Sequence, residues 1–431
     1  MLLKDNYFQR RRTMIRKDDS KIIEVVHSVC CGLDIHKESI SACLVFFDDQ
    51  GRERIEVKAF GTLTDDIMQL RDWLLDHECP VAAMESTGIY WRPVHNVLEG
   101  FIQVILVNAR DVKNVPGRKT DIGDSKWIAG LLKHGLLKGS FIPPKEVRQW
   151  RDLTRLRRRY VQTAADYRRR TQKLFESANI KIDSVISDLF GVSGRNLMNL
   201  LVSGKEIALS DVRGCMKGKL KASEAEIYRS IQGFFNDHHR FQLSLLLGTI
   251  QHLSEEIGII DSRIRDLMMP QQDILERMKK VPGISEIASR DILAEVGPTL
   301  EAFATDAALS SWSGLCPGNN ESAGKRRSGR SPVFKHHLKT IMIEVAWAAI
   351  RTKGSYYKDK YYRLKSRIGA KKAIVAIAHR IMKAIYRIIK DGAVFKDLGE
   401  EYLMLRNKSK KIHHLKKQAQ LLGFTLVPQT T

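Results

Sequence analysis

The sequence predicts a three-part protein in which an α/β domain is followed by a long helical stalk and an all-α domain. Strand-like and helix-like runs alternate over residues 25–140, which predicts the α/β domain. Apolar residues at helical spacing over 145–275 predict the stalk, and shorter helical segments over 276–395 predict the third part. Residues 1–24 and 396–431 are rich in Lys and Arg, so we expect a mobile basic arm and a mobile basic tail.

The elements of the α/β domain come in an informative order. Apolar runs and helical spacings predict a strand over 25–35, strands over 39–47 and 54–60, a helix over 64–77, a strand ending at Glu85, a helix over 91–98, a strand over 102–107 and a helix over 121–132. Asp48-Asp49-Gln50-Gly51 supplies a turn between the second and third strands. Three strands followed by alternating helices and strands resemble the order of the ribonuclease H and RuvC-resolvase fold.

Four acidic residues accompany these elements. Asp34 lies in the first predicted strand, Glu85 ends the fourth, and Asp121 and Asp124 stand at the opening of the last helix. Acids at the ends of apolar strands are costly to bury unless they are paired or bound to a metal. Positions three apart share one helix face, so Asp121 and Asp124 can point the same way. The four residues therefore predict a site for a hard cation.

The charge distribution separates the α/β domain from the rest. The chain carries a formal net charge of +23, which indicates a polyanionic partner such as nucleic acid. Residues 25–140 contain 13 Lys and Arg against 16 Asp and Glu, a net of −3, so the remainder carries +26. This division is expected if one part performs chemistry while another part binds phosphates.

Cysteine usage and hydropathy indicate an intracellular protein. The six cysteines form no Cys-x-x-Cys pair and have no His partner at zinc-like spacing, and most stand in apolar runs. No apolar run approaches the roughly 18 residues that a membrane span requires, and the N-terminus lacks the apolar stretch of a signal peptide. We therefore expect no membrane partner.

Two long helices are predicted within the stalk. The first, over 146–175, is rich in arginine, whereas the second, over 240–268, repeats apolar residues in 4-3 steps through three heptads. Such a repeat is typical of a coiled coil. Residues 183–239 predict a small helical insertion between them. Two arrangements remain open, an antiparallel stalk within one chain or part of a dimer interface.

Two segments predict contacts with a nucleic-acid backbone. The arginine-rich helix offers Arg155, Arg158, Arg159 and Arg169. The second segment is a Pro-Gly turn at Gly283, before a helix over 287–296, and it resembles the helix-hairpin-helix DNA-binding element. The amides of such a turn can hold a phosphate. Ser285 stands where that element has its second glycine, and an ordinary connection between two helices is the alternative.

A glycine-rich basic loop over 312–330 predicts a further phosphate contact. Small residues allow the backbone to approach a ligand closely, and Lys325, Arg326 and Arg327 favour phosphate. Ser322 stands beside these cations, which would stabilise charge developing on a phosphoryl group. Ser322 is therefore a candidate nucleophile.

Five motifs in this order resemble the DEDD-type transposases of bacterial insertion-sequence family one-ten, including its eleven-eleven branch. The motifs are Gly32–Lys37, Met84–Trp91, Gly117–Asp124, Val281–Ile284 and Gly314–Lys325. The resemblance spans roughly residues 27–392. Each motif alone has little specificity, but the ordered set is highly specific.

The resemblance implies a site and its chemistry. Asp34, Glu85, Asp121 and Asp124 would form the acidic tetrad of a RuvC-like domain that binds Mg²⁺, and Ser322 would attack a DNA phosphate to form a phosphoserine link. Oxygen ligands and a phosphoryl substrate favour magnesium on independent physical grounds.

The resemblance also implies partners. They are donor and target DNA and a structured noncoding guide RNA that supplies the sequence specificity, at the nucleoid of a bacterial cytoplasm. Strand exchange between two duplexes needs more than one active site, so we expect a homodimer or homotetramer.

Two other functions remain open. A RuvC-like junction-resolving endonuclease would act through the acidic tetrad alone, and Ser322→Ala would leave its cleavage intact. A non-enzymatic nucleic-acid-binding protein would carry a decayed metal site, against which the intact tetrad argues.

Overall fold

The computed structural model describes residues 24–86, 88–108, 123–218, 221–318, 320–322, 325–328 and 336–425. The predicted basic arm and Asp121 lie outside the described residues, apart from Glu24. The chain divides into two compact units, residues 1–142 and 143–431. None of the helices in the described ranges has the length and apolarity needed to cross a membrane.

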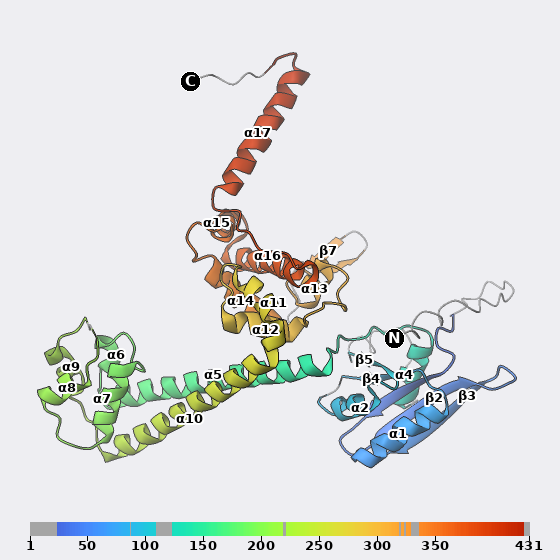
Figure 1. The fold of residues 1–431 in the computed structure, drawn as a ribbon, viewed down its shortest axis with the longest axis horizontal. Coiled ribbons are helices and arrows are strands. Elements are labelled where there is room, and N and C mark those ends of the chain that lie inside the picture. Colours follow the sequence, from blue (N-terminus) through green and yellow to red (C-terminus); the bar gives the residue numbers. More distant parts are fainter. Residues whose placement is uncertain are drawn as a thin grey trace. The chain divides into compact units, whose positions relative to one another are not determined.

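Five strands form one mixed sheet in the described part of the first unit (Figure 1). They are β1 (Cys30–Ile35), β2 (Ile40–Phe47), β3 (Glu53–Phe60), β4 (Val81–Glu85) and β5 (Gln103–Val107), in the spatial order β3-β2-β1-β4-β5. The first three strands pair antiparallel, whereas β4 is parallel to both β1 and β5. The predicted mixture of a meander and alternating elements is thus confirmed.

The predicted first strand is too long at its start. Val25 and Val26 are exposed, and the amides of Val26 and His27 donate to the carbonyl of Lys133 at 2.8 and 3.1 Å. Because this segment bonds to the end of a helix, sheet pairing begins only at Cys30.

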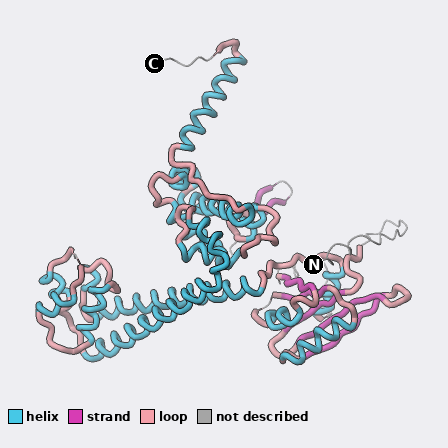
Figure 2. Tube along the Cα trace, in the orientation of Figure 1, coloured by secondary structure: helices cyan, strands magenta, loops and turns pink. Residues whose placement is uncertain are grey.

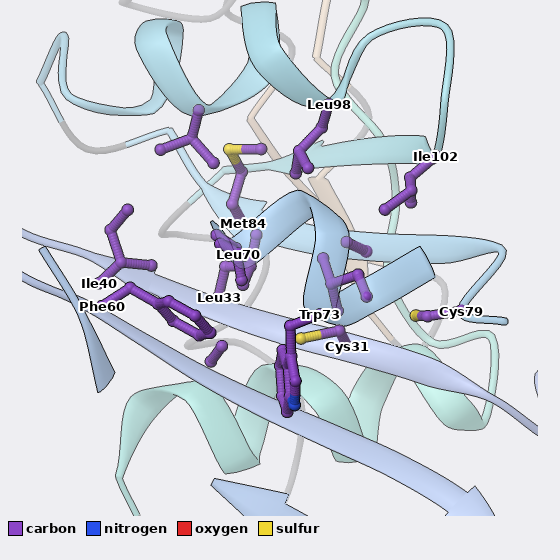
Figure 3. Close-up of a cluster of buried hydrophobic side chains, with 14 of the residues drawn as sticks. Cys31, Leu33, Ile40, Phe60, Leu70, Trp73, Cys79, Met84, Leu98 and Ile102 are labelled. Carbon is purple, nitrogen blue, oxygen red and sulfur yellow. The ribbon is translucent and has the colours of Figure 1, made fainter. Parts of the chain in front are cut away.

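Three helices cover the two faces of the sheet in the described residues. α1 (Thr64–Asp76) and α2 (Trp91–Leu98) pack on one face, and α4 (Asp124–Lys133) packs on the other. Figure 3 shows the first of these cores, with Leu33, Leu70 and Met84 side by side. Successive residues of a strand point to opposite faces. Leu33 and Met84 therefore face α1 and α2, and the residues after them turn toward the α4 side.

The stalk helices of the second unit pack against each other within one chain. α5 (Lys145–Ser177) and α10 (Asp237–Met268) lie side by side in Figures 1 and 2. Arg157 of α5 pairs with Asp261 of α10. Nearer the C-terminal end of α5, Leu174 shares a core with Leu243, which lies near the N-terminal end of α10. Sequence numbers rise along one helix as they fall along the other, so the pair is antiparallel. The intramolecular arrangement is thus the one observed, and a supercoiled geometry remains a prediction.

The predicted helical insertion caps the far end of this pair. Its described helices are α6 (Ile182–Val185), α7 (Val192–Val202), α8 (Leu209–Cys215) and α9 (Glu224–Ser230). Their buried side chains, among them Leu197 and Ile227, share one core with Phe175 of α5 and Leu243 of α10. The insertion therefore has a core of its own at the tip of the stalk.

Helices dominate the rest of the second unit. Its described elements are η1 (Met269–Gln271), α11 (Gln272–Lys279), α12 (Glu286–Val296), α13 (Asp306–Trp312), β6 (Asn320–Ser322), β7 (Lys325–Ser328), α14 (His337–Ala349), α15 (Tyr356–Ile368), α16 (Ala370–Asp391) and α17 (Tyr402–Leu421). Most of these helices share apolar faces, and α16 buries Ile377, Ile381 and Ile385 completely. The second unit thus has a helical core at the other end of the stalk.

Two elements differ from the prediction. The glycine-rich segment contains an antiparallel hairpin, β6 and β7, so this part of the chain is not all-α. A two-residue connection with a glycine favours a hairpin, and the sequence has Ala323-Gly324 between the two strands. The basic tail contains the helix α17, because its sequence has neither Gly nor Pro between Tyr402 and Leu421 and is rich in good helix formers.

Candidate active site

Two of the predicted acids stand at the same level of the sheet. β1 and β4 are parallel neighbours, and Leu33 is paired with Met84 in their register. Asp34 and Glu85 are the next residues of the two strands, so both follow the last registered pair at the carboxyl edge. By the alternation along each strand they turn away from the α1 and α2 core and toward α4.

The first turn of α4 brings a third acid to this edge. α4 begins at Asp124, and the hydroxyl of the neighbouring Ser125 lies 2.9 Å from the hydroxyl of Ser41 on β2. Ser41 is the register partner of Asp34. Since residues opposite each other in an antiparallel pair share one face, the start of α4 lies beside Asp34.

Gly32 explains how α4 comes so close. A Cβ on Gly32 would lie 2.2 Å from the carbonyl oxygen of Ser125 and 2.4 Å from the amide nitrogen of Ala129. No side chain fits at such distances, so the helix backbone rests directly on β1. Asp34 is two residues beyond Gly32 on β1, and Asp124 is the first residue of α4. The contact at Gly32 therefore fixes where Asp124 lies along β1 relative to Asp34.

The carboxylates suit a hard cation by their chemistry. Asp34 is 25% exposed and its Oδ2 lies 3.2 Å from Nε2 of His36. Asp34, Glu85 and Asp124 offer only oxygen donors, which are the ligands that Mg²⁺ prefers. No three His, Cys, Asp or Glu side chains of the described ranges gather closely enough to hold an ion together. The fourth predicted ligand, Asp121, lies outside those ranges.

Ser322 lies in the second unit, on the hairpin. In the register of β6 and β7, Ser322 is opposite Lys325 and Glu321 is opposite Arg326. Asn320 is opposite Ser328, so the register shifts between Asn320 and Glu321. Arg327 lies on β7 at this irregularity, between Arg326 and Ser328. The backbone thus pairs the predicted nucleophile with a predicted phosphate-binding lysine.

The structure gives two of the predicted nucleic-acid contacts partners within the protein. Arg155 makes a bidentate pair with Glu295 of α12, with Nε–Oε1 at 2.9 Å and Nη2–Oε2 at 3.0 Å, and Glu295 is only 2% exposed. Arg158 pairs with Glu344 of α14. These two arginines therefore connect the stalk to the helices beside it.

The other two predicted arginines point outward. Among the described residues, Arg169 has an ion pair only with Asp166, one turn earlier on its own helix, and both side chains are exposed. Arg159 is exposed and makes no ion pair with any described residue. Of the four arginines, these two remain open to a phosphate backbone.

Gly283 serves a packing role. Its φ is +85°, and a Cβ there would lie 2.4 Å from the carbonyl oxygen of Val345 and 2.5 Å from the amide of Ala349. The turn between α11 and α12 therefore rests on the backbone of α14. Ser285 caps α12, since its hydroxyl accepts from the amide of Ala288 at 3.2 Å. A phosphate contact at Gly283 remains a prediction.

Burial perturbs two titratable groups near the Glu295 pair. The pKa of Asp291 is raised to about 6, chiefly because burial disfavours its charge, although Arg157 and Arg158 oppose this effect. The pKa of His336 is lowered to about 4, again chiefly by burial. The junction of α5, α12 and α14 is thus a partly desolvated network of charges.

Sequence reasoning did not single out Gly32, Ser41, Ser125 or Glu295. Gly32 carried a signal, since a glycine inside a strand often marks the close approach of another backbone. Ser41 and Ser125 carried none, because a hydrogen bond across 84 residues leaves no local pattern.

Similarity to known proteins falls on the segments that carry these residues. A transposase family model for the DEDD type of IS110 matches residues 31–180, which contain the four acids, and a model of the transposase IS116/IS110/IS902 family matches residues 275–363, which contain Ser322. The chain is also 24% identical, over 360 residues, to the mini-circle putative transposase for IS117 of Streptomyces coelicolor. That alignment covers 75% of this chain and 84% of the relative. The chain belongs to the IS110 family of transposases, enzymes that act on DNA in transposition.

Proposed function

We propose that this transposase excises and inserts an insertion sequence by Mg²⁺-dependent strand cleavage and exchange, with Ser322 as the nucleophile. The observation that carries the proposal is the placement of Asp34, Glu85 and Asp124 on one face, at the carboxyl edge of a sheet ordered β3-β2-β1-β4-β5. This order is the one that we associate with a RuvC-like domain, and it supports that assignment.

Each group has a defined task in the proposed chemistry. Asp34, Glu85, Asp121 and Asp124 would hold Mg²⁺, which when bound polarises the phosphoryl oxygens and stabilises the leaving oxygen. The Ser322 oxygen forms a bond to phosphorus as the bond from phosphorus to a deoxyribose oxygen breaks. The proton released by the Ser322 hydroxyl ends, in the net reaction, on that departing deoxyribose oxygen. Lys325 supplies positive charge opposite Ser322.

The division into two units bears on the assembly. The acids belong to the first unit and Ser322 to the second. Exchange between two duplexes needs several such pairs of groups, so we propose that a homodimer or homotetramer is the active form.

A structured noncoding RNA is the proposed source of sequence specificity, and the family resemblance is its support. The exposed Arg159 and Arg169 are its proposed contacts on the stalk. Purified transposase should exchange strands only when that RNA is added back, and exchange in nuclease-treated protein would contradict the guide role.

Substitution of Ser322 separates the proposed function from simple hydrolysis. Ser322→Ala should abolish both strand exchange and cleavage of supercoiled donor DNA, because no covalent intermediate forms. A junction-resolving endonuclease would go on cutting with this substitution. Asp34→Asn should also abolish cleavage, and unchanged cleavage by that variant would remove the tetrad from the mechanism.

A further inference from the structure

The C-terminal end of the chain holds an unusual concentration of positive charge. Residues 356–431 contain 18 Lys and Arg against 5 Asp and Glu, a net of +13, which is more than half of the chain's +23. In the described part of this segment, the ion pairs are Arg363 with Asp359 and Lys383 with Asp306 of α13. Most of this charge is therefore left uncompensated by the described residues.

Cations from three helices meet at one place in this segment. Lys360, Arg363 and Arg367 of α15 are joined by Arg380 of α16 and Arg406 of α17. Burial lowers the pKa of Lys360, and the charges of the four arginines lower it further. We call these five residues the C-terminal basic face. Gathering like charges in this way is unfavourable unless an anion binds among them.

Helix α17 extends this face. Its first turn packs on the helices before it through Leu403, which is 6% exposed, and through Tyr402, whose ring centroid lies 5.9 Å from that of Tyr356. Figure 1 shows the ribbon of α17 continuing beyond this turn. The helix contains no acidic residue. Its exposed Arg406 and Lys417 are eleven residues apart, which places them on one side of an α-helix.

We propose that the C-terminal basic face and α17 bind the phosphate backbone of duplex DNA without reading its sequence. Of the five cations of this face, only Arg363 makes an ion pair with a described residue, and the other four can neutralise phosphates. The 20 residues of α17 span about 30 Å, close to one turn of B-form DNA. The major groove of B-form DNA admits an α-helix, whereas the deep and narrow groove of A-form RNA does not.

Most of the C-terminal basic face lies outside the segments that the family models match. The matched segments end at residue 363, so Arg367, Arg380 and Arg406 lie beyond them. These three arginines are exposed, and none makes an ion pair with another described residue. The inference depends on an enzyme that acts on DNA and on neither Ser322 nor the acidic tetrad.

The test compares two triple variants of the full-length chain. One carries Arg367→Gln, Arg380→Gln and Arg406→Gln, and the control carries Lys205→Gln, Arg263→Gln and Arg265→Gln, which removes the same charge from exposed positions elsewhere. Fluorescence anisotropy measures binding to a duplex of arbitrary sequence at several salt concentrations. A plot of log K against log salt has a negative slope, and each lost phosphate contact reduces the magnitude of that slope by about 0.9. The slope of the first variant should therefore be smaller in magnitude by about 2.7.

Each outcome decides the proposal. The proposal is supported if the first variant shows this reduction in slope and the control has the slope of the wild type. The version of the first variant with Lys in place of the three arginines should also have the wild-type slope. Equal slopes for the first variant and the control would overturn it. A first variant that binds duplex DNA normally but has lost affinity for a folded RNA would also overturn it. Thermal unfolding checks that the three exposed substitutions leave the fold intact.

Discussion

At the scale of single residues, glycines fix the closest approaches in this molecule. Gly32 lets α4 rest on β1 beside Asp34, and Gly283 lets the turn before α12 rest on α14. Both belong to motifs whose family resemblance is clear from the sequence, yet the packing reason for each appears only when the facing backbone is located. Gly32 is thus a positioning residue for the candidate metal site.

Gly32→Ala should therefore damage both stability and activity. The added Cβ would overlap backbone atoms of Ser125 and Ala129, and overpacking of this kind lowers the free energy of unfolding by about 1–3 kcal/mol. Gly130→Ala is the matched control, because nothing lies within 4 Å of its added Cβ and alanine favours a helix by about 0.5–1 kcal/mol. Chemical denaturation measures both changes. Equal stability of the two variants would contradict the close approach at Gly32.

At the scale of elements, the arginines of helix α5 (Lys145–Ser177) have different surroundings in its two halves. Arg151 and Arg155 meet the buried Glu295, Arg157 meets Asp261, and Arg158 meets Glu344. From Arg159 onward the arginines of α5 are exposed. Sequence showed the abundance of arginine but not this division, because the carboxylate partners stand about a hundred or more residues away.

Removing the buried carboxylate should unfold the junction. Glu295→Gln removes the buried carboxylate that pairs with Arg155 and Arg151, and breaking a buried pair in this way typically costs about 3–5 kcal/mol. Arg159→Gln should leave the free energy of unfolding within about 0.5 kcal/mol of wild type while lowering the salt slope of nucleic-acid binding by about 0.9. Denaturation and binding assays separate the two effects. If Glu295→Gln changed the salt slope of binding and left the free energy of unfolding unchanged, Arg155 would be a nucleic-acid contact and not a structural partner of Glu295.

The same junction should make stability depend on pH through Asp291. Its pKa is raised from 3.8 to about 6, so the folded state holds this proton more tightly than the unfolded state. The resulting stabilisation is present below about pH 4 and is lost as the pH rises through about 6. The facing charges are Arg157 and Arg158 of α5, Glu295 of α12 and Glu344 of α14.

Asp291→Asn isolates this contribution. His336, whose pKa is lowered to about 4, acts in the opposite direction, because its stabilisation is lost as the pH falls from about 6.5 toward 4. Subtracting the wild-type free energy of unfolding from that of the variant cancels the contribution of His336, which is present in both proteins. The difference should rise in favour of Asp291→Asn between pH 4 and 6, and a constant difference would show that Asp291 titrates normally.

At the scale of the whole molecule, the sequence predicted the sheet, the stalk and the helical C-terminal part because each depends on local periodicity. It could not choose between an intramolecular stalk and a dimer interface, since the heptads of α10 satisfy both. It also missed α17, whose lysines resemble those of a mobile tail. Contacts between residues far apart in sequence, such as the packing of α4 on Gly32, depend on the atoms that face each other in the fold, and no local sequence pattern reports these.

The central claim of the proposed function is that strand cleavage requires both the acidic tetrad and the Ser322 nucleophile. Its most direct test is to trap the covalent intermediate. Wild-type transposase, with Mg²⁺ and guide RNA, is incubated with a nicked donor duplex whose cleaved end diffuses away, and peptide mass spectrometry then locates any DNA adduct. We predict an adduct on Ser322 that is absent from both Ser322→Ala and Asp34→Asn. Cleaved DNA without any protein adduct, or an adduct that persists in Ser322→Ala, would contradict the account.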